Sequence, residues 1–233
     1  VNQRSGWRWN TSKAFLRNAE KRSNLTLWHS THVLGLETEN AGSGPRCVGV
    51  RVERSGGDDV IARAKREVIL SAGAIGSPQL LQLSGIGPAD LLKEHGIDVV
   101  ADLPGVGENL QDHLQIRSVY KVKGVTTLNT MANSLIGKAR IGLEYLLTRS
   151  GPMSMAPSQL CLFTRSSEEY DYANIEYHVQ PLSLDAFGQP LHNFPAITAS
   201  VCNLNPTSRG TVRIRSNDPK QAPAISPNYL STP

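Results

Sequence analysis

Histidine and cysteine are the residue types in this chain best suited to nucleophilic catalysis or metal binding. Its 233 residues include six histidines and three cysteines. The cysteines, Cys47, Cys161 and Cys202, lie far apart, and none belongs to a Cys-x-x-Cys pair. No histidine pair has a cysteine or carboxylate nearby at metal-ligand spacing. We therefore expect no metal site and no disulfide framework, and the unpaired cysteines favour a reducing compartment, the cytoplasm.

One histidine stands in a pattern of its own, Glu176-Tyr177-His178-Val179-Gln180. Successive side chains of a strand point to opposite faces, so Glu176, His178 and Gln180 are predicted to share one face of a sheet. That face can line a pocket, or its polar groups can be hydrogen-bonded parts of a core. His113, next to Asp112, is interpreted as a structural pair that braces a chain crossover.

A run of small residues, Ser71-Ala72-Gly73-Ala74-Ile75-Gly76-Ser77-Pro78, offers a different chemistry. A backbone without bulky side chains allows a ligand to approach closely, and the free N–H groups at a helix N-terminus suit a phosphate. Residues 67–72, just before it, form an apolar run typical of a strand buried in a parallel sheet. The alternative is that the small residues only let a helix pack on a sheet.

The elements that must position these residues follow from periodicity and turn signals. In the first half we expect a helix over residues 13–21 capped by Thr11 or Ser12, strands at 25–29, 32–36, 47–53 and 60–65 forming a meander, a strand at 67–72, a helix with Ser77 as N-cap and Pro78 at its first position, a helix at 88–95 and a strand at 97–100. In the second half we expect a strand at 118–122, a helix whose apolar face carries Leu135, Ala139, Gly142, Leu143 and Leu146, and antiparallel strands at 159–164, 174–180, 196–203 and 211–215. The composition shift near His113 predicts one domain over residues 1–115 and a second over 116–233.

Several longer motifs resemble those of a known family. Residues 68–74 and 76–88, the latter Gly-Ser-Pro-Gln-Leu-Leu-Gln-Leu-Ser-Gly-Ile-Gly-Pro, resemble the second signature of the glucose-methanol-choline (GMC) flavoprotein oxidoreductases. Residues 102–113, with Pro-Gly-Val-Gly and a final Asp-His, are similar to a further family segment, as are residues 9–16, 24–27, 31–33, 205–212 and 227–230. The resemblance covers nearly the whole chain and is loosest between residues 125 and 169.

The resemblance implies an α/β plus α+β fold, in which an incomplete Rossmann-like FAD-binding domain is joined to an antiparallel-sheet substrate domain. It implies FAD as the cofactor, with Val33 beside the adenine and the turn of Ser71, Ala72, Gly73 and Ala74 close to the dinucleotide. The chain has no G-x-G-x-x-G, and the family's catalytic histidine lies in a segment beyond Pro233. We therefore assign no catalytic residue and expect a central piece of a longer protein, inactive alone and weak in FAD binding.

The implied function is oxidation of the CH–OH group of a small-molecule alcohol by hydride transfer to the flavin. An FAD-containing lyase on the same scaffold, similar to hydroxynitrile lyases, is one alternative, and a non-catalytic fragment that serves as an interaction module is another. The formal net charge of +4 is spread along the chain and does not signal a nucleic-acid partner. No apolar stretch approaches the ~20 residues needed to span a bilayer.

Overall fold

The computed structural model describes residues 3–42, 44–186 and 188–232 and shows a chain divided into two compact units. The first unit comprises residues 1–26 and 113–205, and the second comprises residues 27–112 and 206–233. The chain passes between the units at residues 26–27, 112–113 and 205–206, whereas we expected a single boundary after residue 115. Each unit also takes in one end of the chain, an arrangement that a single boundary does not describe.

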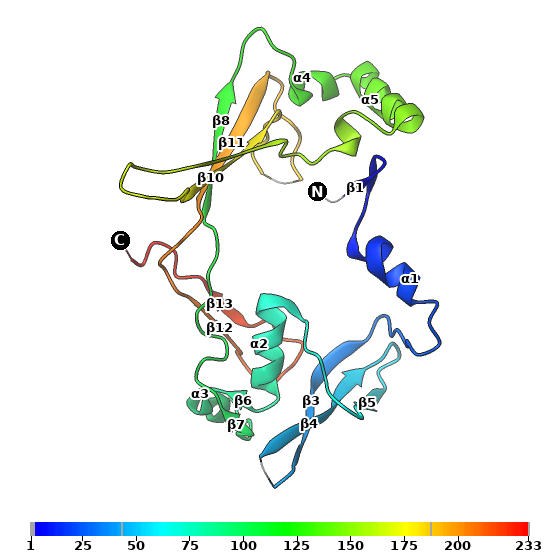
Figure 1. The fold of residues 1–233 in the computed structure, drawn as a ribbon, viewed down its shortest axis with the longest axis vertical. Helices are drawn as coiled ribbons and strands as arrows, with labels where there is room; N and C mark the ends of the chain where they lie inside the picture. Colours follow the sequence, from blue (N-terminus) through cyan, green and yellow to red (C-terminus); the bar gives the residue numbers. More distant parts are fainter. Residues whose placement is uncertain (1–2, 43, 187, 233) are drawn as a thin grey trace. The chain divides into compact units, whose positions relative to one another are not determined.

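The second unit contains a three-stranded antiparallel meander in the order β3-β4-β5, as predicted from period-two alternation (Figure 1). Its elements are β3 (His32–Asn40), β4 (Pro45–Glu53), β5 (Asp59–Arg63), α2 (Gly73–Leu83), β6 (Ile86–Gly87), α3 (Ala89–Glu94), β7 (Ala101–Asp102), β12 (Thr211–Arg213) and β13 (Ala224–Ser226). The predicted strand at 25–29 is wrong, because those residues join no sheet. The guanidinium of Arg54 instead lies over the Trp28 ring, with its Cζ atom 5.1 Å from the centre of that ring.

The predicted buried strand at 67–72 is also wrong. These residues pair with no other strand of the described chain, and the Ile69 side chain is 78% exposed. Apolar sequence alone does not make a strand, since its backbone N–H and C=O groups need a neighbouring strand. The sole parallel pair of strands among the described residues joins β6 to β7. Strand β7 lies at Ala101–Asp102, slightly later in the chain than the strand expected at 97–100.

Helix α2 starts at Gly73 rather than with Ser77 as N-cap, and Pro78 lies inside it. The Ser77 hydroxyl accepts a hydrogen bond from the Ala72 backbone N–H at 3.1 Å, so it caps the helix from within its first turns. Pro78 is the sixth residue of the helix and has no N–H to donate to the Ala74 carbonyl, so one intrahelical hydrogen bond is missing there. The end of the helix at Ser84-Gly85 agrees with the prediction.

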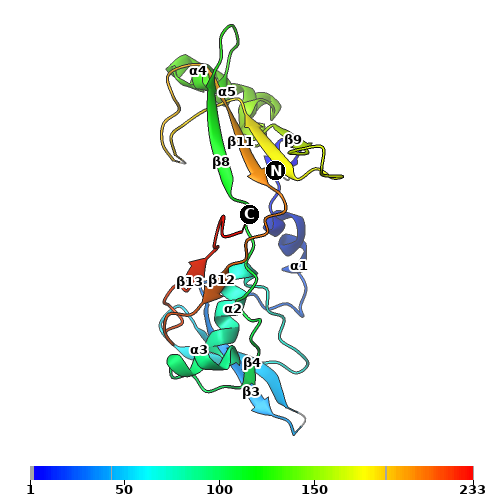
Figure 2. The ribbon, with the colours of Figure 1, turned by 90° about the vertical axis from the view of Figure 1, so that its left-hand side faces the viewer.

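The first unit is built around a four-stranded antiparallel sheet in the order β8-β11-β10-β9 (Figure 2). Its elements are β1 (Gln3–Arg4), β2 (Trp7–Arg8), the π-helix η1 (Ser12–Leu16), α1 (Arg17–Ala19), β8 (Gln115–Lys121), α4 (Leu128–Ala132), α5 (Leu135–Thr148), the 3-10 helix η2 (Pro152–Ser154), β9 (Leu160–Thr164), β10 (Ile175–Gln180) and β11 (Ala196–Asn203). Asn10, and neither Thr11 nor Ser12, accepts the Lys13 N–H at 3.0 Å, because Thr11 already has helical dihedral angles.

The prediction that Glu176 and His178 share a sheet face is confirmed, because His178 Nε2 lies 3.2 Å from Glu176 Oε1. Gln180 ends the same strand in a buried position, where its Nε2 donates to Ser158 Oγ at 3.0 Å. On neighbouring β11, Cys202 is only 4% exposed. Burial, and then the negative charge of Glu176, raise the pKa of the Cys202 thiol above its usual value.

Helix α5 forms where a helix was predicted, but its apolar face is largely exposed and not packed against the unit. Leu135, at the start of that face, is 85% exposed, and the unit buries Ile141 instead. Tyr145, one turn after Ile141, donates its hydroxyl to the Gly6 carbonyl at 3.1 Å, so the N-terminal hairpin determines which face of α5 is buried.

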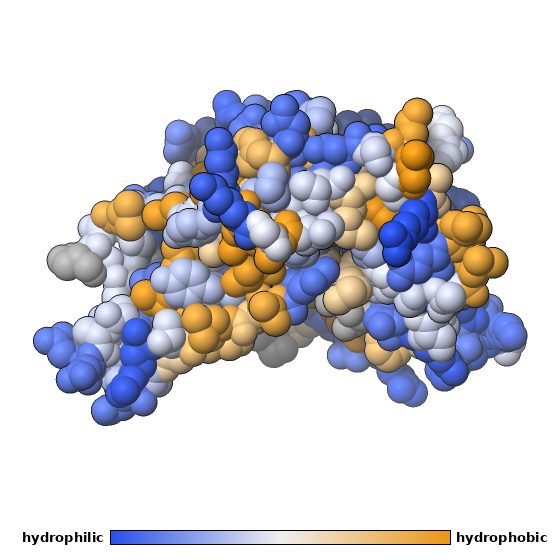
Figure 3. All heavy atoms as spheres, turned by 90° about the horizontal axis from the view of Figure 1, so that it is seen from above, coloured by the Kyte–Doolittle hydropathy of each residue, from blue (hydrophilic) through white to orange (hydrophobic). Residues whose placement is uncertain are grey.

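Figure 3 shows hydrophobic residues among hydrophilic ones on the surface of the molecule. Within the described chain, no helix combines the length and apolar character that crossing a membrane requires.

Candidate functional site

A cavity of about 220 Å³ lies between strand β3 and helix α2 in the second unit. Its lining residues are His32, Val33, Ala72, Gly76, Gln79, Leu80, Leu83 and Pro219. Two predicted cofactor-binding residues, Val33 and Ala72, thus border the same cavity although 39 positions separate them in the sequence. Ala74 borders a different cavity, of about 310 Å³, together with Pro78 and residues 107–111.

The close approach of β3 to α2 depends on Ser84, a residue that the sequence did not single out. Its hydroxyl accepts the Leu36 backbone N–H at 2.8 Å and donates to the Leu80 carbonyl at 2.6 Å. The register between β3 and β4 shifts just after Val33, so the strand bulges where it meets the cavity. The signal in the sequence that could have indicated this role is a serine at the end of an apolar helix, where its hydroxyl can bond to a neighbouring strand.

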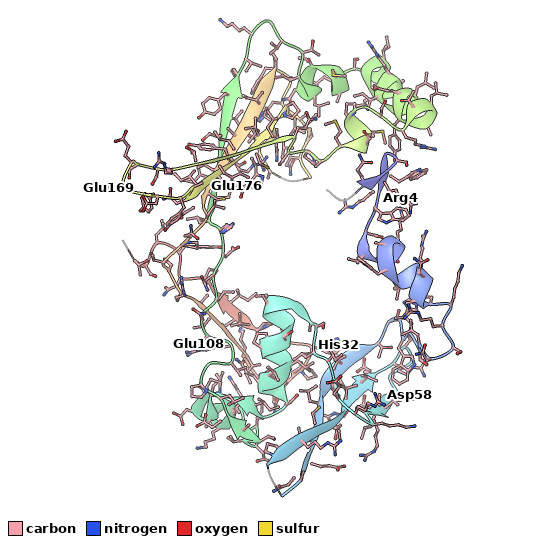
Figure 4. The ribbon with its side chains drawn as sticks, viewed as in Figure 1. Arg4, His32, Asp58, Glu108, Glu169 and Glu176 are labelled. Carbon is pink, nitrogen blue, oxygen red and sulfur yellow. The ribbon has the colours of Figure 1, made fainter. Side chains whose placement is uncertain are left out.

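The C-terminal segment closes another side of the cavity. His32, labelled in Figure 4, donates from Nε2 to the Pro219 carbonyl at 3.2 Å, and Gln79 Nε2 donates to the Gln221 carbonyl at 2.9 Å. Nearby, Lys220 pairs with Glu53 at 2.7 Å, and hydrogen bonding to that carboxylate raises the pKa of Lys220. Sequence reasoning missed Pro219 because nothing local relates a loop near residue 219 to residues 32 and 72.

Gln82 anchors the other side of α2. It is 0% exposed, and its Nε2 donates to the carbonyls of Val106 and Val212 at 3.1 and 3.0 Å. Its Oε1 accepts the Ile214 backbone N–H at 2.9 Å. All the hydrogen-bonding atoms of this amide face backbone groups from two distant segments, so Gln82 holds the helix, the 103–107 crossover and β12 together.

The start of α2 presents small residues and exposed backbone. Ser71, Ala72, Gly73 and Ala74 are all exposed, and a Cβ added at Gly73 would meet nothing within 4 Å. Gly73 has φ +81°, a left-handed conformation that favours glycine. The first N–H groups of a helix lack intrahelical acceptors, and the helix dipole makes that end partially positive.

This arrangement is suited to binding rather than to bond making. The cavity is mainly apolar, has His32 as its one titratable lining residue, and adjoins a helix start that favours negative charge. It can hold a planar ring and bring an attached anionic group near residues 71–74. The remaining histidines lie elsewhere. His113 donates from Nε2 to the Leu204 carbonyl at 3.1 Å, which supports a bracing role, but the partner is not Asp112, whose carboxylate accepts from the Tyr229 hydroxyl instead.

Comparison with known proteins identifies relatives of the whole chain. Residues 1–115 match a family model described as GMC oxidoreductase. The oxygen-dependent choline dehydrogenase of Brucella ovis is 41% identical over 97% of this chain and 40% of its own length, and that of Photobacterium profundum is 42% identical over 97% and 39%. The chain therefore spans about 40% of the length of these curated relatives.

Solved structures show the same relationship. A crystal structure of formate oxidase matches 91% of this chain and 41% of its own chain with a TM-score of 0.82 and 28% identity. Pyridoxine 4-oxidase from Mesorbium loti matches 100% and 41%, with a TM-score of 0.78 and 27% identity. On the family model and these relatives together, this chain belongs to the GMC oxidoreductase family.

Proposed function

We propose that this chain is part of an FAD-dependent oxidoreductase that oxidises the CH–OH group of a small-molecule alcohol. The observation that carries the proposal is the cavity between Val33 on β3 and Ala72 at the start of α2, in a chain 41% identical to oxygen-dependent choline dehydrogenases. Residues 1–115 would form an incomplete Rossmann-like part of the FAD domain, and residues 116–233 an antiparallel-sheet part of the substrate domain. The unpaired cysteines favour a cytoplasmic location.

The residues at the cavity fit one portion of FAD. About 220 Å³ is below the roughly 300–1,000 Å³ of most small-molecule sites, so the cavity suits a single ring system rather than the whole dinucleotide. We assign it to the adenine, beside Val33, with the small residues Ser71 to Ala74 near the rest of the dinucleotide. FAD, when bound, supplies the flavin ring that accepts a hydride. This chain contributes binding and shape, and we assign none of its residues to proton transfer.

The experiment is performed on the full protein encoded by the reading frame that contains this chain. We expect it to purify with flavin absorbance, and choline or another primary alcohol added without oxygen to bleach that absorbance. Cleavage of a cyanohydrin without net bleaching would instead establish the lyase alternative. A full-length protein without flavin would overturn the proposal and favour an interaction module.

A substitution tests the cavity itself. Ala72→Trp adds an indole at a residue that lines the cavity, so we expect the flavin content of the purified full protein to fall at least tenfold. The matched control is Ala41→Trp, an exposed alanine in the β3–β4 hairpin of the same unit, which should keep full flavin content. Equal flavin content in the two variants, each folded by circular dichroism, would show that the adenine lies elsewhere.

A further inference from the structure

The first unit brings a thiol, an imidazole and a carboxylate together on one face of its sheet. Cys161 on β9 pairs in register with His178 on β10, and Cys161 Sγ lies 3.6 Å from His178 Nδ1. On the other side of the same imidazole, Nε2 lies 3.2 Å from Glu176 Oε1. Figure 4 labels Glu176 on this strand. Antiparallel pairing, which linear spacing does not reveal, creates the group.

The spacing of the donor atoms matches that of a metal site. One donor atom from each of Cys161, Glu176 and His178 lies within 4.8 Å of the other two. Around a tetrahedral zinc ion, bond lengths of about 2.0–2.3 Å place neighbouring donors roughly 3.3–3.8 Å apart. The distance between Cys161 Sγ and His178 Nδ1 already lies in that range. Because one imidazole nitrogen binds the ion, the Glu176 carboxylate, which now faces Nε2, must turn toward Nδ1 to become the third ligand.

The donor types select the class of ion. Thiolate and imidazole suit zinc and other borderline divalent ions, whereas magnesium and calcium require oxygen ligands. We propose that Cys161, His178 and Glu176 form a zinc-binding site, with water as the fourth ligand. Cys161 is exposed and the other two residues are partly exposed, so an ion can enter from solvent. Two adjacent paired strands hold the ligands, which makes the site rigid.

A second group of donors, His113, Glu176 and Cys202, shares the same carboxylate. There the Cys202 thiol is buried and lies 4.0 Å from Glu176 Oε2, longer than the spacing around zinc. His113 already uses Nε2 in its bond to the Leu204 carbonyl. Because its thiol is buried at a longer spacing and its imidazole nitrogen is already engaged, this second group is the poorer zinc site, and we infer that zinc occupies the exposed one.

Zinc binding is measured on the reduced 233-residue chain, stripped of metal with a chelator and titrated against a chromophoric zinc indicator. We expect one zinc ion per chain. Removing even an outer partner of a metal ligand weakens affinity about 10–100-fold. Cys161→Ser and His178→Gln should therefore each bind zinc at least tenfold more weakly than the unsubstituted chain.

The other two cysteines supply matched controls. Cys47→Ser, in the other unit, and Cys202→Ser should both keep the affinity of the unsubstituted chain. Unchanged affinity in Cys161→Ser, or loss in Cys202→Ser alone, would overturn the proposal. If Cys161→Ser does not fold, cobalt(II) provides the readout in the unsubstituted chain: a thiolate-to-metal absorption band is expected, and it should disappear after alkylation of the exposed thiol. A band that survives alkylation would also overturn the proposal.

Discussion

Replacing Gln82 by leucine tests whether this amide holds the second unit together. Leucine is similar in size and fits the helix, so the change removes hydrogen bonds without opening a large cavity. It leaves the carbonyls of Val106 and Val212 and the N–H of Ile214 without this partner, in surroundings where Gln82 is 0% exposed. The substitution therefore isolates the polar contribution of one side chain.

The expected loss follows from the groups left behind. Each buried backbone group without a partner costs about 1–3 kcal/mol. The bonds to Val212 and Ile214 are buried and the bond to Val106 is part-buried, so two groups carry this full cost, and we expect Gln82→Leu to lower the free energy of unfolding by at least about 2 kcal/mol. For a chain of this length, 1 kcal/mol shifts the melting temperature by about 2–4 °C, so the expected decrease is about 4 °C or more.

The assay is urea unfolding followed by circular dichroism, with Gln79→Leu as the matched control. Gln79 lies on the same helix, but its one hydrogen bond, to the Gln221 carbonyl at 2.9 Å, is exposed. A net contribution of about 0.5–1.5 kcal/mol is expected for such a bond. If the two variants lose equal stability, or Gln82→Leu loses less than about 1 kcal/mol, the role assigned to Gln82 is wrong.

Two further predictions concern the same unit. Gly107 has φ +85°, and a Cβ added there would meet the Val212 carbonyl oxygen. Left-handed strain and overpacking should therefore make Gly107→Ala lower the free energy of unfolding by at least about 2 kcal/mol in the same urea assay. Gly105→Ala, with open space around the new Cβ, is the control, and an equal loss of stability there would contradict the reasoning. Hydrogen bonding to Asp112 raises the pKa of Tyr229, so the neutral phenol is favoured, and the stability it provides below about pH 10 is lost as the pH rises through the folded-state pKa. Asp112→Ala should lower the pKa of Tyr229, as followed by NMR of its ring carbon; an unchanged titration would show that this contact is absent in solution.

Local patterns in the sequence predicted most of the regular elements. The β3–β5 meander and the strands β9, β10 and β11 follow from period-two alternation bounded by turn residues, and both signals act within a few positions of the chain. The end of α2 next to Ser84-Gly85 and the presence of helix α5 are local in the same way. The start of α2 was predicted wrongly. Ser77-Pro78 is a local helix-start signal, but the helix already begins at Gly73, which has a left-handed conformation.

What the sequence by itself determined was the family motif around residues 68–88, the alternation that put Glu176 and His178 on one face, and the small residues at the start of α2. Only the tertiary structure decided which neighbours these residues meet. Pairing of β9 with β10 sets Cys161 against His178, and the Ser84 hydrogen bonds bring Val33 to Ala72. The physical reason is that side-chain direction is a property of the local backbone, whereas register and packing depend on segments far apart in the chain.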